Sequence, residues 1–282
     1  MSKEEKWDLH IKPKNNWLDI DFRELFRYRD LIYLFVKRDF VTFYKQTILG
    51  PLWYIIQPLI NALVFTVIFG NLAKISTDGI PPFIFYMAGT VVWGYFAACI
   101  TLTSNTFNQN AEIFGKVYFP RITVPIANVI ISLLQFLIQF VIFIFFLFYF
   151  ISQGSEIYPN FYILLLPLLV FQMAILGLGF GILISSLTTK YKDLTFVMSF
   201  GIQLWMFATP IVYPFSIIPE KYKIICSLNP MTSVVEIFKL AFLGSSSIEF
   251  THVLISVAVT ISVFVFGLFM FNKMEKNFMD TV

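Results

Sequence analysis

Long apolar runs alternate with short polar segments along most of this chain. Six of the runs are about 20 residues or longer, which is the length an α-helix needs to cross a lipid bilayer. A spanning helix satisfies its backbone hydrogen bonds internally, whereas barrel strands are shorter and alternate in polarity. The pattern predicts an all-α membrane protein with a six-span domain at residues 47–272, the spans being about 51–72, 83–104, 122–151, 161–187, 194–212 and 251–271.

The segments flanking these spans are predicted to lie on the cytoplasmic side. Residues 1–24 are polar and form an arm that lacks the apolar core of a signal peptide. Residues 25–46 are apolar but hold too many charges for a span, and most of the charges share one side of a helix. We expect an interfacial amphipathic gate helix here, with its basic side toward the cytoplasm. Residues 273–282 are predicted to form a short cytoplasmic tail.

The longest segment between spans, residues 213–250, is rich in proline and contains two apolar pieces too short to cross a bilayer. Proline removes a helix hydrogen bond and clashes with the preceding turn, so no continuous helix fits. The pattern favours two half-helices that dip back into the outer leaflet, the alternative being a loop packed on the surface. Glu236 and Lys239, three residues apart, can pair on the second half-helix.

The polar segment 105–125 separates the second and third spans. Asn108 or Asn110 can cap a helix, and Pro120 and Pro125 are expected to stop it, which leaves about two turns. Apolar side chains on this short helix are available to a partner, namely Ile113, Phe114, Val117 and Tyr118. The alternative is an ordinary solvated connection between two spans.

The distribution of Lys and Arg predicts the orientation of the chain in the membrane. Sixteen of the twenty Lys and Arg residues fall in segments that share a side if both termini are inside, and four fall on the other side. This bias predicts cytoplasmic termini and a cytoplasmic segment 105–125. The net charge of +3 is small and gives no reason to expect nucleic-acid binding.

Patterns for bond chemistry are absent from the sequence. It contains no GxxxxGK[ST], GxSxG or HExxH, and its two histidines, His10 and His252, do not form a metal-binding motif, so we predict neither catalytic nor metal-binding residues. The spans hold no Asp, Glu, Lys or Arg near their centres, although coupled transporters and intramembrane enzymes usually need such groups. We therefore expect transport powered by a separate polypeptide.

Two side-chain patterns inside the spans invite interpretation. Ala174, Gly177, Gly181 and Ser185 form a small-residue face, and close packing within one subunit is favoured over a dimer seam. Aromatic side chains could stack against sugar rings along a pore, although most must face lipid or other helices. The candidates for lining a route are Trp53, Trp93, Tyr95, Phe96 and Trp205.

Several motifs together resemble one known family. They are KRDFVTFYKQTILGPLWYIIQPL (37–59), FGKVYFPRITVPIA (114–127), TTKYKDL (188–194), TPIVYP (209–214), LNPM (228–231) and FNKMEKNFMDTV (271–282). In this order and spacing the chain resembles the membrane subunit of a type-2 ATP-binding-cassette exporter, in the branch that exports lipid-linked O-antigen, capsule or teichoic-acid polymers. The resemblance covers nearly all of the chain beyond residue 25.

The resemblance implies a homodimer bound to two copies of a separate ATPase, which binds ATP and Mg²⁺, in the inner membrane of a bacterium. It implies an ATPase-coupling helix at Asn110, Glu112, Ile113, Phe114, Gly115, Lys116, Val117 and Tyr118. It places a cytoplasmic gate at Arg27, Lys37, Arg38, Asp39, Tyr44 and Lys45, and a periplasmic gate at Pro210, Tyr213, Pro214, Pro219 and Pro230.

Two features depart from the family pattern. Relatives commonly carry a basic residue where this chain has Phe43, and arginines where it has Lys190 and Lys192. Phe43 removes a possible polar contact between the gate and the substrate head group, and the lysines keep the charge but lose the bidentate fork of arginine.

The sequence thus predicts a non-enzymatic permease that exports a lipid-linked polysaccharide and contacts membrane lipids. A relative that moves a lipid or drug, a passive channel and a membrane-embedded glycosyl- or acyltransferase are the alternatives. The transferase would need an acid or histidine constellation at the membrane face, and the sequence contains none.

Overall fold

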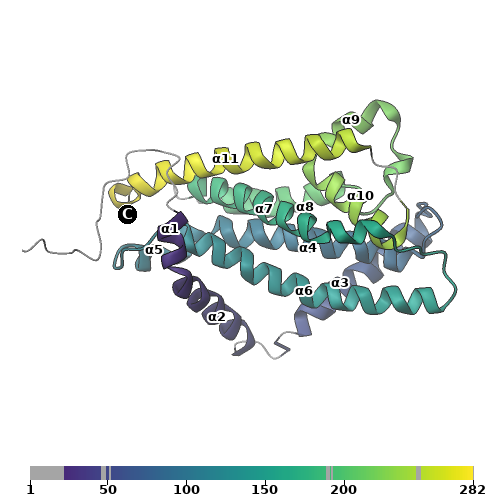
Figure 1. Ribbon diagram of the computed structural model, residues 1–282, viewed down its shortest axis with the longest axis horizontal. Helices are drawn as coiled ribbons and strands as arrows, with labels where there is room; N and C mark the ends of the chain where they lie inside the picture. Colours follow the sequence, from purple (N-terminus) through teal and green to yellow (C-terminus); the bar gives the residue numbers. More distant parts are fainter. Residues whose placement is uncertain are drawn as a thin grey trace, which may run out of the picture.

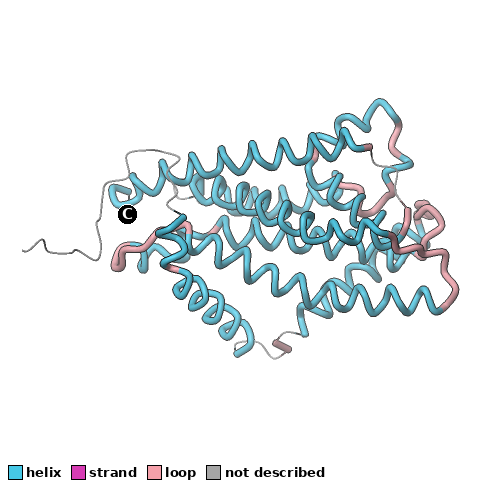
Figure 2. Tube along the Cα trace, in the orientation of Figure 1, coloured by secondary structure: helices cyan, strands magenta, loops and turns pink. Residues whose placement is uncertain are grey.

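The computed structural model describes residues 22–45, 49–50, 52–188, 191, 193–245 and 249–281, with the backbone alone for 22–24, 43–44 and 275–281. All regular elements in these ranges are helices (Figure 2), as the all-α prediction requires. The α-helices are α1 (Phe22–Arg27), α2 (Arg29–Lys45), α3 (Leu52–Phe65), α4 (Pro82–Ser104), α5 (Thr106–Phe114), α6 (Thr123–Ser152), α7 (Leu166–Thr188), α8 (Leu194–Ala208), α9 (Glu220–Leu228), α10 (Pro230–Leu243) and α11 (Phe250–Thr281). A π-helical segment (Thr66–Leu72) extends α3, and 3₁₀ turns lie at Phe161–Leu165 and Phe215–Ile217.

Five helical segments in the described ranges are long and apolar enough to cross a membrane: Leu52–Leu72, Pro82–Ser104, Thr123–Ser152, Phe161–Thr188 and Phe250–Met274. Helices α9 and α10, bent by 104°, form either a broken sixth span or a re-entrant pair. This agrees with the two half-helices predicted for the proline-rich segment. The fold is therefore that of a multi-pass α-helical membrane protein.

The predicted fifth span is shorter than expected. Helix α8 has 15 residues, or roughly 22 Å at 1.5 Å per residue, against a hydrocarbon core of about 30 Å. It ends at Ala208 because Thr209 precedes Pro210, and the proline ring disfavours helical geometry in the residue before it. Thr209 is accordingly extended, with φ −99° and ψ 143°.

Helix α4 is the centre of the bundle and lies between α6 and α7 (Figure 1). It also contacts α3 and α10, and 78% of its span is buried. A helix that is apolar on all sides is stable either against lipid or among other helices, and the burial of α4 shows that other helices surround it. The other spans are far less buried, and α3 is the least, at 11%.

The small-residue face of α7 packs against α4 of the same subunit. A Cβ added to Gly177 would lie 2.5 Å from Cys99 Cβ, and one added to Gly181 would lie 2.5 Å from Thr103 Cβ. On the opposite side of α7, Gly179 meets the backbone of α11 at Phe264. Packing within one subunit is therefore confirmed for this face.

The two ends of the bundle differ. Helices α1 and α5 and the C-terminal end of α11 gather at one end, and α9 and α10 lie at the other (Figure 1). At the first end an aromatic cluster joins α2, α5, α6 and α11, and it contains Phe35, Phe107, Phe114, Phe119 and Phe271. The region predicted as a tail continues α11 as helix up to Thr281.

Two predicted elements at this end differ in detail. The interfacial helix is two helices, because a turn at Tyr28 separates α1 from α2. Its apolar face packs partly inside the subunit, where Phe35 is buried, while Tyr33 and Leu34 are exposed. The predicted arm lies almost wholly outside the described residues.

Helix α5 begins earlier than predicted, directly after Asn105. Asn110 is not a cap but lies inside the helix, where its side-chain amide donates to the Thr106 carbonyl at 3.0 Å. Pro125 does not stop a helix either, because it lies in the first turn of α6, where the missing N–H has no helical partner to lose.

Candidate functional site

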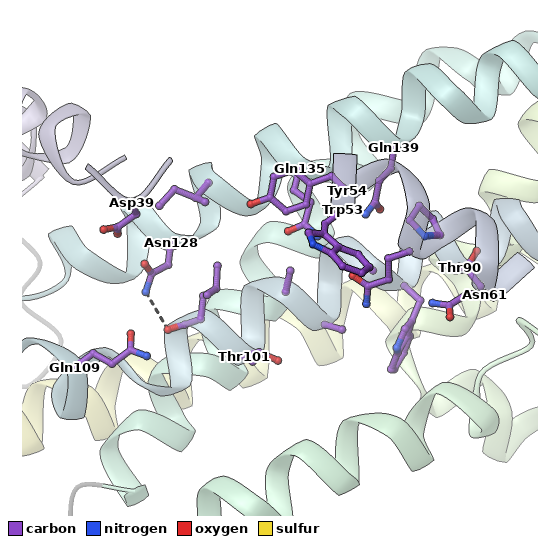
Figure 3. A pocket seen from close by; sticks show the side chains of 18 of the residues that line it. Asp39, Trp53, Tyr54, Asn61, Thr90, Thr101, Gln109, Asn128, Gln135 and Gln139 are labelled. Carbon is purple, nitrogen blue, oxygen red and sulfur yellow. Dashed lines mark hydrogen bonds between the residues drawn. The ribbon is translucent and has the colours of Figure 1, made fainter. Parts of the chain in front are cut away.

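A cavity of about 730 Å³ lies between α2, α3, α4 and α6 and reaches α5 (Figure 3). This volume is in the range of small-molecule binding sites. Side-chain amides are the commonest polar groups in its lining: Gln57, Asn61, Gln109, Asn110, Asn128, Gln135 and Gln139. The cavity thus combines many neutral hydrogen-bonding groups with a location among membrane-spanning helices.

Helix α6 supplies one wall through Asn128, Gln135 and Gln139. Intervals of seven and eleven residues return an α-helix to within about 20° of the same direction. These three amides therefore form one stripe, about 16 Å long at the helical rise. The sequence places the stripe in a span whose other faces are apolar.

Helix α4 supplies the floor with Thr90, Gly94, Ala97 and Thr101, which lie on one face at the same intervals. Small side chains leave the space that the cavity occupies. Asn128 donates to the Leu102 carbonyl at 3.0 Å, shown as the dashed line in Figure 3. A Cβ built on Gly94 would lie 3.3 Å from Gln139 Oε1. The two stripes therefore run side by side in opposite chain directions.

Helix α3 supplies the opposite wall with Trp53, Gln57 and Asn61. All three are exposed on the surface of the subunit, and Gln57 and Asn61 are one helical turn apart. Exposed side chains on this wall mean that the cavity opens outward from the single subunit. An amide in such a position is costly in lipid but not beside water or a polar partner.

Two charged residues on α2, Arg38 and Asp39, lie at one end of the cavity. The Arg38 Nε donates to Asp39 Oδ1 at 2.6 Å, and Nη2 donates to Oδ2 at 3.1 Å. The guanidinium also lies over the Phe35 ring, 4.9 Å from its centroid. The pair is thus neutral overall and is positioned by the aromatic cluster. Three other residues predicted for the cytoplasmic gate are exposed and lie outside the cavity: Arg27, Lys37 and Lys45. The side chain of Tyr44, also predicted for this gate, lies outside the described residues.

The five aromatic residues predicted to line a route separate into two groups. Trp53 and Trp93 line the cavity. Tyr95 and Phe96 are buried within the bundle, where Tyr95 packs against Phe136 with ring centroids 5.2 Å apart. Trp205 packs against Phe96 at 5.1 Å and donates through Nε1 to Asn229 Oδ1 at 3.0 Å. Tyr95, Phe96 and Trp205 therefore build the bundle and do not line this cavity.

The predicted coupling segment also separates into buried and exposed parts. Phe114 is 3% exposed and belongs to the aromatic cluster, so it is unavailable to a partner, contrary to the prediction. Asn110 is likewise buried. A turn follows α5, in which Val117 is 60% and Tyr118 is 58% exposed. The outward-facing part of the segment comprises Glu112, Gly115, Lys116, Val117 and Tyr118, with Ile113 half-buried.

At the other end, hydrogen bonds hold the proline-rich segment against the bundle. Asn229 caps α10 by accepting from the Met231 N–H at 3.1 Å, and its Nδ2 donates to Thr209 Oγ1 at 2.8 Å. Pro230 follows at the first helical position, where its fixed φ suits the helix. Of the predicted periplasmic-gate residues, Pro210, Pro214 and Pro230 are buried, Tyr213 is half-buried and Pro219 is exposed.

Tyr213 lies between α8 and the 3₁₀ turn that follows it. Burial raises the pKa of the Tyr213 phenol above its usual value. Its hydroxyl donates to the Phe207 carbonyl at 3.3 Å. This bond connects the turn after α8 back to the end of that helix.

Glu236 and Lys239 pair as the spacing predicted, with Lys239 Nζ 3.6 Å from Glu236 Oε1. Both residues are almost fully buried inside the protein. Lys239 also lies over the Phe85 ring of α4, 3.8 Å from its centroid. The pair therefore joins α10 to the centre of the bundle.

The amide lining was not predicted from the sequence, because ionisable groups were taken as the signal of function within the spans and amides are uncharged. A detectable signal was nevertheless present, since Gln57 and Asn61 share one face of their span, as do Asn128, Gln135 and Gln139. The sequence does not show that the amide faces of α3 and α6 point toward the same cavity.

Comparison with known proteins places this helical fold in a family. The family of ABC-2 type transporters matches residues 30–243, which is more than half of the chain. The chain belongs to the ABC-2 type transporter family.

Individual relatives within this family are named as permeases of O-antigen export systems. The chain is similar to the O-antigen export system permease protein RfbA of Klebsiella pneumoniae, with 30% identity over 253 residues that cover 89% of this chain and 94% of the relative. It is also similar to the O-antigen export system permease protein RfbA of Myxococcus xanthus, with 26% identity over 223 residues that cover 78% and 83% of the two chains. The type-2 exporter family expected from the motifs is thus confirmed.

Proposed function

We propose that this chain is the permease subunit of an ATP-driven exporter that moves a lipid-linked polysaccharide, O-antigen or a similar polymer, across the inner membrane of a bacterium. Family membership supports a transporter, and the relatives named as O-antigen export permeases support the class of cargo. In this reading the chain itself catalyses no reaction.

The observation that carries the proposal is the amide lining of the cavity. Gln57 and Asn61 lie within one span and Gln135 and Gln139 within another, and all four face the cavity. Uncharged polar groups inside a membrane domain are stable where they meet water or a polar ligand. Amides and indole rings together suit a sugar chain, because sugars offer hydroxyl groups at their edges and apolar ring faces.

The energy for transport comes from a partner in this proposal. The sequence contains no nucleotide-binding loop of the GxxxxGK[ST] type, which supports a separate ATPase. As the family resemblance implies, two copies of that ATPase bind ATP and Mg²⁺. The exposed turn after α5, with Val117 and Tyr118 at its tip, is the docking point for that ATPase. Helix α5 transmits movement because its buried side is fixed to the aromatic cluster.

A second copy of the chain completes the route. The wall formed by α3 is exposed in a single subunit, and a homodimer would enclose the amides of both copies away from lipid. The distribution of Lys and Arg puts the α5 end and both termini in the cytoplasm. Helix α2 is then the inner gate, and α9 and α10 with the preceding prolines form the outer gate.

Reconstitution into proteoliposomes tests this function. The permease with its ATPase partner should move a lipid-linked glycan into the vesicle only when ATP and Mg²⁺ are present, and the permease alone should hydrolyse no ATP. Replacing Gln57 and Gln135 with Leu should slow transport, whereas Gln203→Leu, on an exposed face of α8 outside the cavity, should not. ATP hydrolysis by the isolated chain, or transport that is unaffected by the cavity variants, would contradict the proposal.

A further inference from the structure

The charge of the cavity lining indicates which class of polymer it accepts. Among the described residues that line the cavity, the charged side chains are Arg38 and Asp39. These two neutralise each other through two hydrogen bonds of 2.6 and 3.1 Å. The lining therefore has no net charge along its length.

The polar groups of the lining both donate and accept hydrogen bonds. Each amide side chain carries two N–H donors and a carbonyl acceptor. Sugar hydroxyl groups also donate and accept, so they can bind both the N–H groups and the carbonyl oxygen of an amide. Phosphate and carboxylate groups only accept, so an anion can use the N–H groups but meets unfavourable dipoles at the carbonyl oxygens.

The position of the amides reinforces this preference. The stripe of Asn128, Gln135 and Gln139 runs along α6 for about 16 Å, far enough to meet consecutive units of an extended chain. A polyanion in this part of the membrane domain would bring several charges past walls in which Arg38, the one cation among the described lining residues, is already paired with Asp39. Burying an unpaired charge is much more costly than burying a neutral group that forms hydrogen bonds.

We infer that the cavity selects an uncharged polysaccharide and discriminates against polyanionic polymers, such as chains joined by phosphodiester bonds. The inference rests on the proposed function, since it specifies which polysaccharide the exporter carries. The indole rings of Trp53 and Trp93, which also line the cavity, supply apolar surfaces for the faces of neutral sugar rings.

Transport of two matched probes by the reconstituted permease–ATPase complex tests the inference. The probes are a polyprenyl-linked mannan and a polyprenyl-linked poly(glycerol phosphate) of equal length. We expect ATP-dependent uptake of the mannan to be at least about tenfold faster, the ratio that a difference of roughly 1.4 kcal/mol produces. Equal rates, or faster transport of the poly(glycerol phosphate), would overturn the inference while leaving the export function intact. Transport of neither probe would overturn the proposed function and the inference with it.

Charge variants give the second arm of the experiment. Gln135→Lys places a cation in the stripe and should shift the ratio of the two rates toward the polyanion by about tenfold. Gln57→Lys on the exposed wall should act in the same direction, and it keeps the test valid if the first variant fails to assemble. Gln153→Lys is the matched control, because it adds the same charge to an exposed position just beyond α6, outside the cavity, and should leave the ratio unchanged. An unchanged ratio in assembled Gln135→Lys and Gln57→Lys complexes would refute selection by the lining.

Discussion

The ammonium group of Lys239 donates a hydrogen bond to the carbonyl oxygen of Pro210 at 2.5 Å. Lys239 is on α10 and is 1% exposed, while Pro210 lies in the turn after α8. Because the same ammonium pairs with Glu236 and lies over the ring of Phe85, one buried cation connects the turn after α8, α10 and α4. The proposed outer gate is thus fixed to the bundle by a charged group that depends on its partners.

Removing this cation should destabilise the protein. In Lys239→Met the Glu236 carboxylate keeps its burial but loses its counter-charge, and breaking a buried pair in this way costs about 3–5 kcal/mol. Thermal unfolding of the detergent-solubilised protein should show a clear drop in midpoint. Lys221→Met, at an exposed position of α9, is the matched control and should have little effect.

The double variant Lys239→Met with Glu236→Met sharpens this test. It leaves no unpaired charge, so it should recover much of the lost stability. If Lys239→Met unfolds at the same temperature as the native protein, the buried pair does not have the structural role assigned to it.

Two glycine-to-alanine substitutions should have opposite effects. A Cβ at Gly181 would lie 2.5 Å from Thr103 Cβ and 2.7 Å from Thr103 Cγ2, so α7 and α4 would have to separate. We expect Gly181→Ala to reduce the free energy of unfolding by about 1–3 kcal/mol, as overpacking does in other cores. Denaturation of the purified protein measures the change.

Gly201→Ala is the control for that substitution. It lies within α8, and apart from its own chain neighbours and the nearby backbone of α8 no heavy atom lies within 4 Å of the added Cβ. Alanine favours a helix over glycine by up to about 1 kcal/mol, so this variant should be as stable as the native protein or more so. Equal losses at the two positions would argue against the packing of α7 on α4.

Val117 and Phe114 should respond differently to a negative charge. Val117 is exposed in the turn after α5, so Val117→Glu should leave the membrane domain assembled. It should nevertheless lower recovery of the ATPase in pull-down experiments by roughly tenfold, corresponding to a loss of about 1.4 kcal/mol of binding. Export should fall in parallel, while Val117→Thr should retain most activity.

Phe114→Glu should instead damage the fold. Phe114 is buried between Phe107 and Phe119, with ring centroids at 5.9 and 5.6 Å. A carboxylate there has no described cation to replace these contacts except Arg121, which lies over the same ring at 5.6 Å. Low yield and early unfolding should distinguish it from Val117→Glu. Normal export by the Val117→Glu variant would count against docking of the ATPase at this turn.

The helical fold could be predicted from the sequence because the hydrophobicity of each span reflects its position in the membrane. Apolar runs of about 20 residues identify most of the spans, and the prolines between residues 210 and 230 indicate that no continuous helix fits there. The end of the fifth span was predicted less well, because it was expected near Val212 and α8 ends at Ala208. Spacing along one helix also predicted the Glu236–Lys239 pair and the small face of α7. These features depend on neighbours within a few residues, so one helix is enough to specify them.

The functional surfaces depended on contacts between distant segments. The sequence shows that Phe114 and Val117 are both apolar, but only the meeting of α2, α5, α6 and α11 buries the first and leaves the second exposed. It likewise shows five aromatic candidates, of which helix packing turns Trp53 and Trp93 toward the cavity and Tyr95 and Phe96 into the core.

By itself, the sequence determined the class of protein, the number of apolar segments and the bias of positive charge, because hydrophobic periodicity and composition act locally. Only helix packing brings the amides of α3 and α6 to the same cavity, whose floor is formed by the small side chains of α4. A helix determines which of its residues share a face, but the packing of other helices determines what that face meets. The amide-lined cavity therefore exists only in the folded bundle.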